Sequence, residues 1–377
     1  MKKLIANLSL SLFSMLLFFL ILEFIVFRFI LLAPDLAIPE YVDDLIRYKA
    51  NHVGTFRVKN EIASEFRINS NGWNSKYQRY NTTKDPEKYR IAIIGDSYIA
   101  GYQVDYKKSV AEQLESKLGP STEVYRFGID GAPLSQYLEM LRKEVLKFSP
   151  DMVIINIVHN DFNESYSTVG GVFRSSFLKL KIENSRVIEE IAPTKYQAPW
   201  YSWIREGSAT WKYLAYRQQI RFDVLRSLIL GKNHSIEYRA NIDTNRLKED
   251  LRNNAIITDY ILKQIKEICD AKGIELIVLM DADNEGIYEK DKLGKITNTS
   301  ILSLNKVAAT AAKKHGIHFI DLHGLFEKEY SINKKRFSFI NDGHWNEYVH
   351  NLVADILEEY IDTEIKPKHL KNKHLGD

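Results

Sequence analysis

The sequence predicts an α/β protein in which helices cover both faces of a five-stranded parallel sheet, preceded by one N-terminal transmembrane helix. Five short, mostly apolar runs are typical of strands that are buried on both faces. Segments with apolar residues at helical spacing separate these runs. Strands that alternate with helices pair in parallel, because each helix carries the chain back to the same end of the sheet.

The order of these elements follows from the apolar pattern and from the glycines and prolines that interrupt it. We expect strands at residues 90–94, 123–127, 152–158, 274–280 and 317–322. We expect helices at residues 110–118, 134–145, 247–271 and 301–315, and a last helix after Trp345 with its buried stripe at 349–357. Glycines follow three of these helices, at Gly119, Gly273 and Gly316, as is common at helix ends.

Length and composition exclude several classes of protein. A chain of 377 residues forms one large domain or two small ones, and a hydrophobic fraction of 45% is enough for a substantial core. The net charge of +3 gives no indication of nucleic-acid binding. The single cysteine, Cys269, excludes an intrachain disulfide and a cysteine-rich zinc site.

The N-terminal region is typical of a membrane anchor. Residues 4–22 are almost wholly apolar, and after Glu23 the apolar run continues to residue 32 with Arg28 inside it. The span exceeds the roughly 20 residues needed to cross a bilayer. A cleaved signal peptide is the alternative, but this apolar core is long and no Ala-x-Ala site follows it. Lys2 and Lys3 favour a cytoplasmic N-terminus. We therefore expect an uncleaved anchor at residues 1–33, with the remainder periplasmic or extracellular.

The rest of the chain divides into four parts. Residues 34–88 form a juxtamembrane segment whose prolines argue against long helices, with a short strand and turn at 66–73 around Asn71 and Gly72. The α/β domain covers residues 89–365, with an aromatic-rich insertion at about 163–244 that lacks the strand–helix rhythm. Residues 366–377 form a lysine-rich tail that we expect to be mobile.

Four polar clusters follow predicted strands or precede the last helix. Ser97 follows the first strand through Gly95 and Asp96, and the other clusters are at residues 128–131, 159–161 and 341–344. Glycine, aspartate and serine are also common in ordinary turns, so each cluster has a plain structural explanation. A doubly wound sheet, however, brings the carboxyl ends of its strands to one edge. We therefore expect the four clusters to form a single site.

These residues have the chemistry of acyl transfer. A serine hydroxyl becomes a strong nucleophile when a base takes its proton, and His344 is the candidate base for Ser97. Asp342 is the candidate carboxylate that orients the histidine. The backbone N–H groups of Ser97 and Gly131 and the side-chain amide of Asn160 are candidate donors to an oxyanion. No residue pattern calls for a cofactor or a metal.

Taken together, the four clusters resemble the sequence blocks of the SGNH (GDSL-type) hydrolases. Gly95-Asp96-Ser97 resembles the first block, the run ending at Gly131 the second, His159-Asn160-Asp161 the third and Asp342-Gly343-His344 the last. The blocks lie between residues 90 and 357. The N-terminal anchor is similar to that of bacterial membrane-attached members. The resemblance implies a flavodoxin-like sheet, a catalytic triad of Ser97, His344 and Asp342, and an oxyanion hole from Ser97, Gly131 and Asn160.

The resemblance also implies a reaction: hydrolysis or transfer of an acyl group carried on an oxygen ester. Together with the expected location, it points to acyl esters, such as acetyl esters, of a cell-envelope or exported polysaccharide, or to another small acyl ester. Two positions depart from the family pattern. Val158 replaces the usual glycine of the third block, and Asn341 stands three residues before His344, where an aspartate is common.

These departures motivate an alternative from a different class, a catalytically inactive protein of the same fold that binds glycan or a partner. If Asn341 rather than Asp342 oriented His344, the histidine would lack a charged partner. A third possibility is a nucleotide- or flavin-binding domain. It is weaker, because no Gly-x-Gly-x-x-Gly or other phosphate-binding loop follows a predicted strand.

Several other polar residues have structural explanations. We expect Asp96 and Asp161 to accept backbone N–H groups in turns, and His159 to fill space in a loop. His350 is expected on the surface of the last helix. The spacing of three further histidines does not match a zinc site; these are His315, His318 and His323.

The insertion contains most of the residues that the expected site leaves unexplained. Its aromatic side chains suit the core of a lid, a platform for sugar rings or a membrane interface; they are Tyr196, Trp200, Tyr201, Trp203, Trp211, Tyr213 and Tyr216. Its basic residues are expected to form a solvated face; they are Arg217, Arg221, Arg226 and Lys232.

Overall fold

The computed structural model describes residues 2–166, 174–220, 238–239, 242–243, 246–294 and 300–365. The expected mobile tail at 366–377 lies outside these ranges, as do Arg221, Arg226 and Lys232. The predictions for those residues therefore remain predictions.

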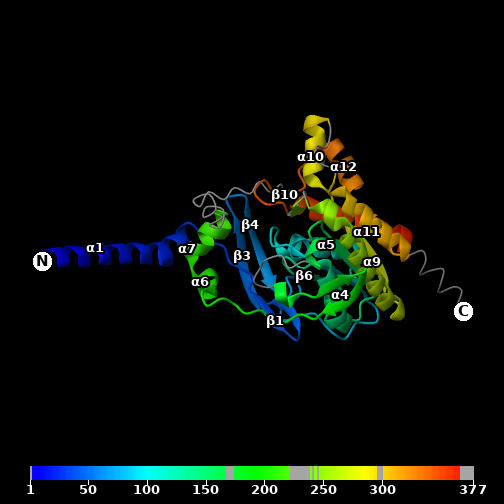
Figure 1. Ribbon diagram of the computed structural model, residues 1–377, viewed down its shortest axis with the longest axis horizontal. Helices are drawn as coiled ribbons and strands as arrows, with labels where there is room; N and C mark the ends of the chain where they lie inside the picture. Colours follow the sequence, from blue (N-terminus) through cyan, green and yellow to red (C-terminus); the bar gives the residue numbers. More distant parts are fainter. Residues whose placement is uncertain are drawn as a thin grey trace, which may run out of the picture.

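A five-stranded parallel sheet forms the centre of the chain (Figure 1). Its strands are β5 (Tyr89–Gly95), β6 (Thr122–Gly128), β7 (Met152–Ile157), β12 (Glu275–Met280) and β13 (His318–Asp321). They lie in the order β13-β12-β7-β5-β6, and every neighbouring pair is parallel. This is the flavodoxin-like order, in which the direction of winding reverses between the first and third strands. The predicted fold class is confirmed.

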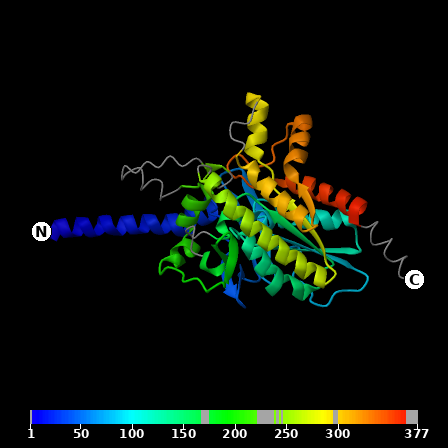
Figure 2. The ribbon, with the colours of Figure 1, turned by 45° about the vertical axis from the view of Figure 1, so that its right-hand side comes forward.

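Helices cover both faces of the sheet, as expected (Figure 2). One layer contains α4 (Leu134–Lys143), α9 (Leu247–Ala271) and α11 (Leu302–Lys314), and the other contains α3 (Val110–Leu118) and α13 (Glu347–Tyr360).

Successive strand residues serve opposite layers, because side chains alternate across a strand. Ile94 belongs to the apolar cluster under α4 and α9, whereas Ile93 belongs to the cluster under α3 and α13. Both are fully buried, and each such side chain contributes about 1.5–3 kcal/mol to the stability of the fold.

The pattern of the sequence did not reveal three helices, α2 (Ser97–Ala100), α10 (Asn284–Leu293) and α12 (Leu322–Asn333). The first is a single turn, and most side chains of the other two are exposed or half-buried, so their apolar periodicity is weak. Short helical segments complete the domain; they are η2 (Tyr106–Lys108), η3 (Val145–Phe148), α5 (Asp161–Glu164), η4 (Arg174–Ser176) and η6 (Ile361–Ile365).

The juxtamembrane segment forms two antiparallel hairpins and contains no helix. They pair β1 (Pro39–Val42) with β2 (Leu45–Tyr48), and β3 (His52–Val58) with β4 (Ile62–Ile68). The expected strand near residue 66 is the end of β4. The expected turn follows it, with Gly72 at a φ of 86°.

The insertion begins with an antiparallel hairpin, β8 (Lys179–Glu183) and β9 (Arg186–Ile191). Three helical segments follow, α6 (Ser202–Gly207), α7 (Ala209–Trp211) and η5 (Lys212–Arg217). A two-residue pair, β10 (Tyr238–Arg239) and β11 (Ile242–Asp243), lies shortly before α9.

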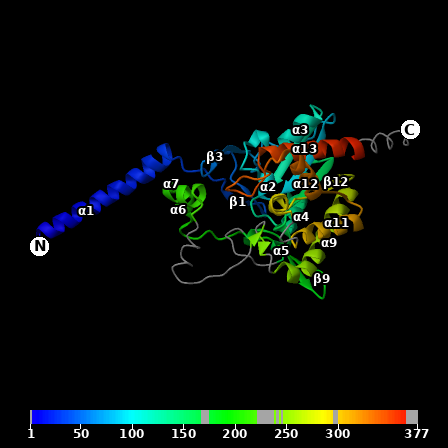
Figure 3. The ribbon, with the colours of Figure 1, turned by 90° about the horizontal axis from the view of Figure 1, so that it is seen from above.

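The N-terminal region is helical, with α1 (Lys2–Ile21) continuing into η1 (Leu22–Ile30). Among the described residues this is the one helix long and apolar enough to cross a membrane, by the criteria of length and composition. A signal sequence satisfies the same criteria. The helix extends away from the rest of the chain (Figures 1 and 3).

Two predictions about surface residues were wrong. His350 is buried, because its side of α13 faces α3, and its Nδ1 accepts the Val110 N–H at 3.2 Å. Burial lowers the pKa of His350 to about 3. Arg217 does not belong to a solvated face. Its guanidinium donates to the carbonyl oxygens of Lys59 (3.0 Å) and Leu32 (2.7 Å). These hydrogen bonds join the insertion to residues that precede the α/β domain.

The end of β6 lies directly against the short helix α2. A Cβ atom built on Gly128 would stand 2.1 Å from the Ala100 nitrogen and 2.5 Å from the Ile99 carbonyl carbon. Only glycine permits this approach, since the obstructing atoms are backbone. The contact fixes α2, and with it Ser97, over the end of the neighbouring strand.

We predict that Gly128→Ala destabilises the protein by about 1–3 kcal/mol, because the added methyl group forces α2 away from β6. Urea denaturation of the full chain in detergent, followed by tryptophan fluorescence, measures the change. Gly324→Ala in α12 is the control, since a Cβ there meets nothing within 4 Å. It should raise stability by about 0.5–1 kcal/mol. Equal stability of the two variants would contradict the steric argument.

Candidate functional site

The first part of the site is the turn between β5 and α2. Asp96 precedes α2, and its side chain accepts the Tyr98 N–H at 2.9 Å. Ser97 is therefore the first residue of a helix that begins at the carboxyl end of a central strand. Asp96 performs the turn-forming role expected from the sequence. Asp161 does so as well, accepting the Val158 N–H at 2.8 Å.

The second part is the loop of residues 338–346, which precedes α13. Its ends are joined by a bridge between Ser338 and Trp345. Glu61, in the turn between β3 and β4, fixes its middle. The Glu61 carboxylate accepts the N–H groups of Ile340 (2.6 Å) and Asn341 (2.8 Å) and the Asn341 side-chain amide (2.8 Å).

These two parts meet in a chain of hydrogen bonds. His344 Nε2 lies 2.8 Å from Ser97 Oγ, and His344 Nδ1 lies 2.5 Å from Asp342 Oδ1. Asp342 Oδ1 also accepts the backbone N–H of His344 at 3.0 Å. Serine, imidazole and carboxylate thus have the connectivity of a nucleophile, its base and the group that orients the base.

The structure distinguishes between the two residues considered as partners of His344. Asp342 contacts the imidazole directly, whereas the Asn341 amide donates to Glu61. The departure at Asn341 therefore leaves the histidine with a charged neighbour. Val158, the other departure, is buried at the end of β7.

Tyr98 packs against the imidazole, and Trp345 packs against Tyr98. The Tyr98 ring lies 4.9 Å from the His344 ring, centroid to centroid, and 5.3 Å from the Trp345 ring. Tyr98 Oη donates to the Gly343 carbonyl at 3.3 Å, and Trp345 Nε1 donates to Asp281 Oδ1 at 2.9 Å. Sequence reasoning missed Tyr98, Trp345 and Asp281. Their position in the sequence could have indicated the first two, because Tyr98 directly follows Ser97 and Trp345 directly follows His344.

Carboxylates around the imidazole favour its charged form. Burial opposes that charge, but Asp342 together with Asp96 and Asp130 raises the pKa of His344 to about 9. Burial also raises the pKa of Asp342, but the positive charge and hydrogen bonds of His344 lower it more, leaving it below its usual value. Burial raises the pKa of Asp96 to about 6.

The position of Asp96 gives the serine hydroxyl two alternative acceptors. Ser97 Oγ lies 3.2 Å from Asp96 Oδ2 and 2.8 Å from His344 Nε2. When His344 is protonated, its Nε2–H donates to Ser97 and the hydroxyl donates to Asp96. When the imidazole is neutral, the hydroxyl donates to Nε2, which is the reactive arrangement of a nucleophile beside its base.

The expected oxyanion donors follow three neighbouring strands of the sheet, with Ser97 after β5, Gly131 after β6 and Asn160 after β7. Within the described part of the molecule, the backbone N–H groups of Ser97 and Gly131 have no protein acceptor. Gly131 has a φ of 67°, and a Cβ atom built on it would meet nothing within 4 Å. Asn160 lines the same cavity as Asp342 and His344.

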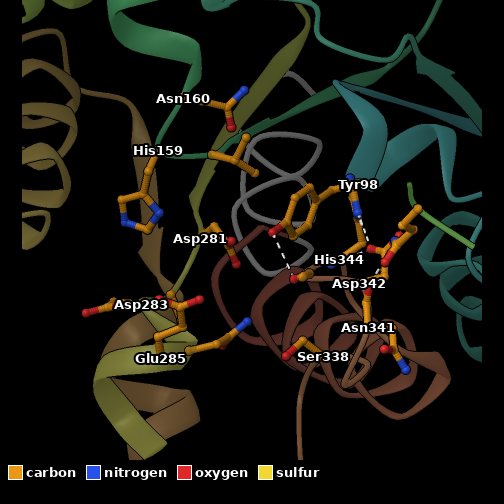
Figure 4. A pocket seen from close by; sticks show the side chains of 15 residues that line it. Tyr98, His159, Asn160, Asp281, Asp283, Glu285, Ser338, Asn341, Asp342 and His344 are labelled. Carbon is orange, nitrogen blue, oxygen red and sulfur yellow. Dashed lines mark hydrogen bonds and ion pairs between the residues drawn. The ribbon is translucent and has the colours of Figure 1, made fainter. Parts of the chain in front are cut away.

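That cavity has a volume of about 390 Å³. Figure 4 shows Asp342 and His344 on one side of it and His159 on the other, with Asp281 between them. Most of the labelled side chains are polar. Besides Asp342 and His344, they include His159, Asn160, Asp281, Asp283, Glu285 and Ser338. Burial raises the pKa of Asp281 to about 7. The cavity therefore suits a hydroxyl-rich ligand that exchanges hydrogen bonds with carboxyl and amide groups.

The remaining histidines have separate partners. His159 is buried, bonds Asn305 Oδ1 at 3.0 Å, and has its pKa lowered to about 4 by burial, so it stays neutral. His315 contacts Asp259, and His318 contacts Tyr360. The described residues contain no group of three or more histidine, cysteine or acidic side chains that could hold a metal ion.

One protein family matches the part of the chain that contains the four clusters. The model of the GDSL-like Lipase/Acylhydrolase family matches residues 93–350, a range that contains every residue of the expected site. No curated protein matches this chain.

Among solved structures, a lipase/acylhydrolase from Enterococcus faecalis is 18% identical, covering 74% of this chain and 98% of its own, with a TM-score of 0.38. An acetyl xylan esterase is 14% identical, covering 72% and 99%, with a TM-score of 0.40. An alpha/beta hydrolase enzyme from the metagenome of Lake Arreo, Spain, is 12% identical, covering 71% and 93%, with a TM-score of 0.39.

We predict that His344 titrates with a pKa of about 9. Its imidazole should remain charged at neutral pH and lose its proton only as the pH rises through that value. Asp342→Asn should lower this pKa, because it removes the carboxylate that most strongly favours the charged ring. NMR of ¹⁵N-histidine-labelled protein, assigned with His344→Asn, measures both values. Asn341→Ala is the control and should leave the pKa unchanged, since Asn341 bonds Glu61.

Proposed function

Because this chain belongs to the GDSL-like lipase/acylhydrolase family, we propose that it is a membrane-anchored serine esterase or O-acyltransferase. Its substrate is an acyl ester, such as an acetyl ester, of a cell-envelope or exported polysaccharide. The observation that carries the proposal is the hydrogen-bonded chain from Ser97 through His344 to Asp342. In this proposal Ser97 is the nucleophile, His344 the general base and acid, and Asp342 the group that orients the histidine.

The first half of the reaction forms an acyl-enzyme. Ser97 Oγ attacks the acyl carbon while its proton passes to His344 Nε2, 2.8 Å away. Asp342, on the other ring nitrogen, stabilises the imidazolium. The tetrahedral intermediate collapses, and the Nε2 proton passes to the departing alcohol oxygen. The acyl group is then bonded to Ser97.

The second half releases the acyl group. Water, or the hydroxyl of an acceptor sugar, attacks the acyl-enzyme while its proton passes to His344. The intermediate collapses, and Ser97 Oγ leaves and takes that proton. Hydrolysis and acyl transfer differ only in the identity of this acceptor.

Developing charge on the acyl oxygen requires hydrogen-bond donors already in place. The N–H groups of Ser97 and Gly131, which have no acceptor among the described residues, are suited to this role. Asn160 contributes its side-chain amide from the cavity wall. Each such donor typically lowers the barrier by about 3 kcal/mol.

The polar cavity beside His344 supports a carbohydrate as the alcohol part of the ester. Carboxyl and amide side chains such as Asp283, Asn284 and Glu285 line it, and they exchange hydrogen bonds readily with sugar hydroxyls. A long aliphatic alcohol offers no hydroxyl groups along its chain with which these side chains could exchange hydrogen bonds.

The proposed location rests on the N-terminal helix. Lys2 and Lys3 precede its apolar segment and favour a cytoplasmic N-terminus under the positive-inside rule. The helix then spans the membrane once, and the α/β domain lies in the periplasm or outside the cell.

The alternative is an inactive protein of the same fold that binds glycan or a partner. In the sequence, the departures at Val158 and Asn341 motivated it. The contact between Asp342 and the imidazole weakens the support from Asn341. Chemical labelling of the serine separates the two functions.

We predict that a fluorophosphonate probe labels Ser97 in the full-length protein and that Ser97→Ala abolishes the labelling. The same variant should lose hydrolysis of acyl esters, measured on acetylated glycans and on aryl acetates. Comparison of these two substrate sets tests the proposed carbohydrate specificity. A folded wild-type protein that neither reacts with the probe nor releases acid from any ester of the panel would contradict the proposed catalysis and support the binding function instead.

We predict that Asp342→Ala lowers kcat by about 10³–10⁴-fold, the size of effect expected when a catalytic histidine loses its orienting carboxylate. Asn341→Ala is the matched control at the neighbouring position. Its effect should be far smaller, because Asn341 supports the loop through Glu61 and does not touch the ring. Steady-state rates on an aryl acetate measure both. A larger loss of kcat in Asn341→Ala than in Asp342→Ala would assign the orienting role to Asn341 and contradict the prediction.

A further inference from the structure

Residues 200–217, which comprise α6, α7, η5 and the two residues before them, are here called the collar. Figures 1 and 3 place α6 and α7 beside the end of the N-terminal helix. We propose that the collar is a second membrane contact, which lies on the lipid headgroups around the emerging helix. This inference rests on the membrane anchor of the proposed function and is independent of the proposed chemistry.

Glu23 attaches the collar to the helix. Its carboxylate accepts the Ser208 hydroxyl at 2.9 Å and the N–H groups of Ala209 (2.6 Å) and Thr210 (2.9 Å). Arg28 reinforces this attachment, because Nη2 lies 3.2 Å from Glu23 Oε1 and 3.1 Å from the carbonyl oxygen at Gly207. The ion pair between Glu23 and Arg28 thus binds the start of α7 to the apolar N-terminal helix.

A second set of contacts fixes the other end of the collar. The Phe27 ring is buried against Tyr213, with 4.8 Å between ring centroids. Arg217 donates to the carbonyl oxygens of Leu31 and Leu32, just after the helix ends. Because the middle of the collar and its last residues are both held, the collar keeps a fixed height along the helix.

The apolar run before Glu23 sets that height. Residues 4–22 are almost wholly apolar and follow Lys2 and Lys3, within a continuous helix, Lys2–Ile30, of 29 residues. At about 1.5 Å per residue, such an apolar run is about 30 Å long, close to the thickness of the hydrocarbon core of a bilayer. Glu23, the first charged residue after this run, therefore lies at the outer boundary of the hydrocarbon, and α7 lies at the level of the headgroups.

The side chains at the start of the collar suit this environment. Trp200 is 82% exposed, Trp203 65% and Tyr201 54%. Tryptophan and tyrosine concentrate at membrane interfaces, where the ring contacts apolar chains and the N–H or O–H stays hydrated. Their exposure excludes the core of a lid for these three residues. The cavity beside His344 is lined by other side chains, which leaves the bilayer favoured over a sugar platform there.

The collar also connects to the proposed active site. Gln219, two residues beyond η5, lines the cavity and donates from Nε2 to the Asn341 carbonyl oxygen at 2.8 Å. Seating the collar on the bilayer therefore fixes the distance between the membrane surface and the loop that carries Asp342 and His344. Substrate is consequently engaged close to the membrane from which the protein emerges.

Tryptophan quenching by brominated lipid tests the proposal. The full chain is reconstituted into nanodiscs of phosphatidylcholine, either unmodified or brominated near the top of the acyl chains. We expect bromination to quench the wild-type fluorescence, and the combined substitution Trp200→Ser and Trp203→Ser to remove much of that quenching. The control is Ile332→Ser, which replaces an exposed apolar side chain of α12 (71% exposed). Its tryptophan fluorescence should be quenched by brominated lipid to the same fraction as that of the wild type. Equal fractional quenching of the wild type and the double variant would overturn the proposal.

Flotation with phosphatidylcholine vesicles separates the possible failures. A chain that floats, but whose quenching does not depend on Trp200 and Trp203, keeps its anchor and overturns the collar contact. A chain that does not float overturns both the anchor and the collar. Ester hydrolysis measured on the same samples reports on the proposed catalytic function independently of either result.

Discussion

The hydrogen bond between Ser97 Oγ and His344 Nε2 is the contact on which the proposed chemistry depends. It joins the turn after the first strand of the sheet to the loop before the last long helix, residues separated by 247 positions. The parallel sheet makes the contact possible, because all its strands end at one edge. Gly128 helps to position Ser97, because its lack of a side chain lets the backbone of α2 lie directly against the end of β6.

The surroundings of this contact are unusually rich in carboxyl groups. Asp96, Asp281 and Asp161 are all buried, and burial raises the pKa of each. Each also accepts a hydrogen bond from a neighbouring donor, which limits the cost of removing it from water. Asp96, together with Asp342 and Asp130, favours the protonated form of His344, so these carboxylates determine how often Ser97 faces a neutral base.

The loop that carries Asp342 and His344 is supported largely from the juxtamembrane side. Glu61 accepts hydrogen bonds from it, and Gln219 donates one to it. These two supports are themselves joined, because the backbone N–H of Lys59 donates to the Arg217 carbonyl oxygen at 2.6 Å. Hydrogen bonds thus connect the loop that carries Asp342 and His344 to the segments that adjoin the N-terminal helix, so these segments help to support the site.

The sequence by itself determined the sheet, the helices of both layers and the four clusters, because apolar periodicity and turn residues are local signals. It did not reveal α10 and α12, whose exposed faces weaken that periodicity, and it misplaced His350, since which side of α13 meets α3 is a matter of packing. Only the tertiary structure decided that Asp342 rather than Asn341 contacts the imidazole, and that Glu23 binds α7. Those contacts depend on the relative orientation of segments distant in the chain, which no local pattern encodes.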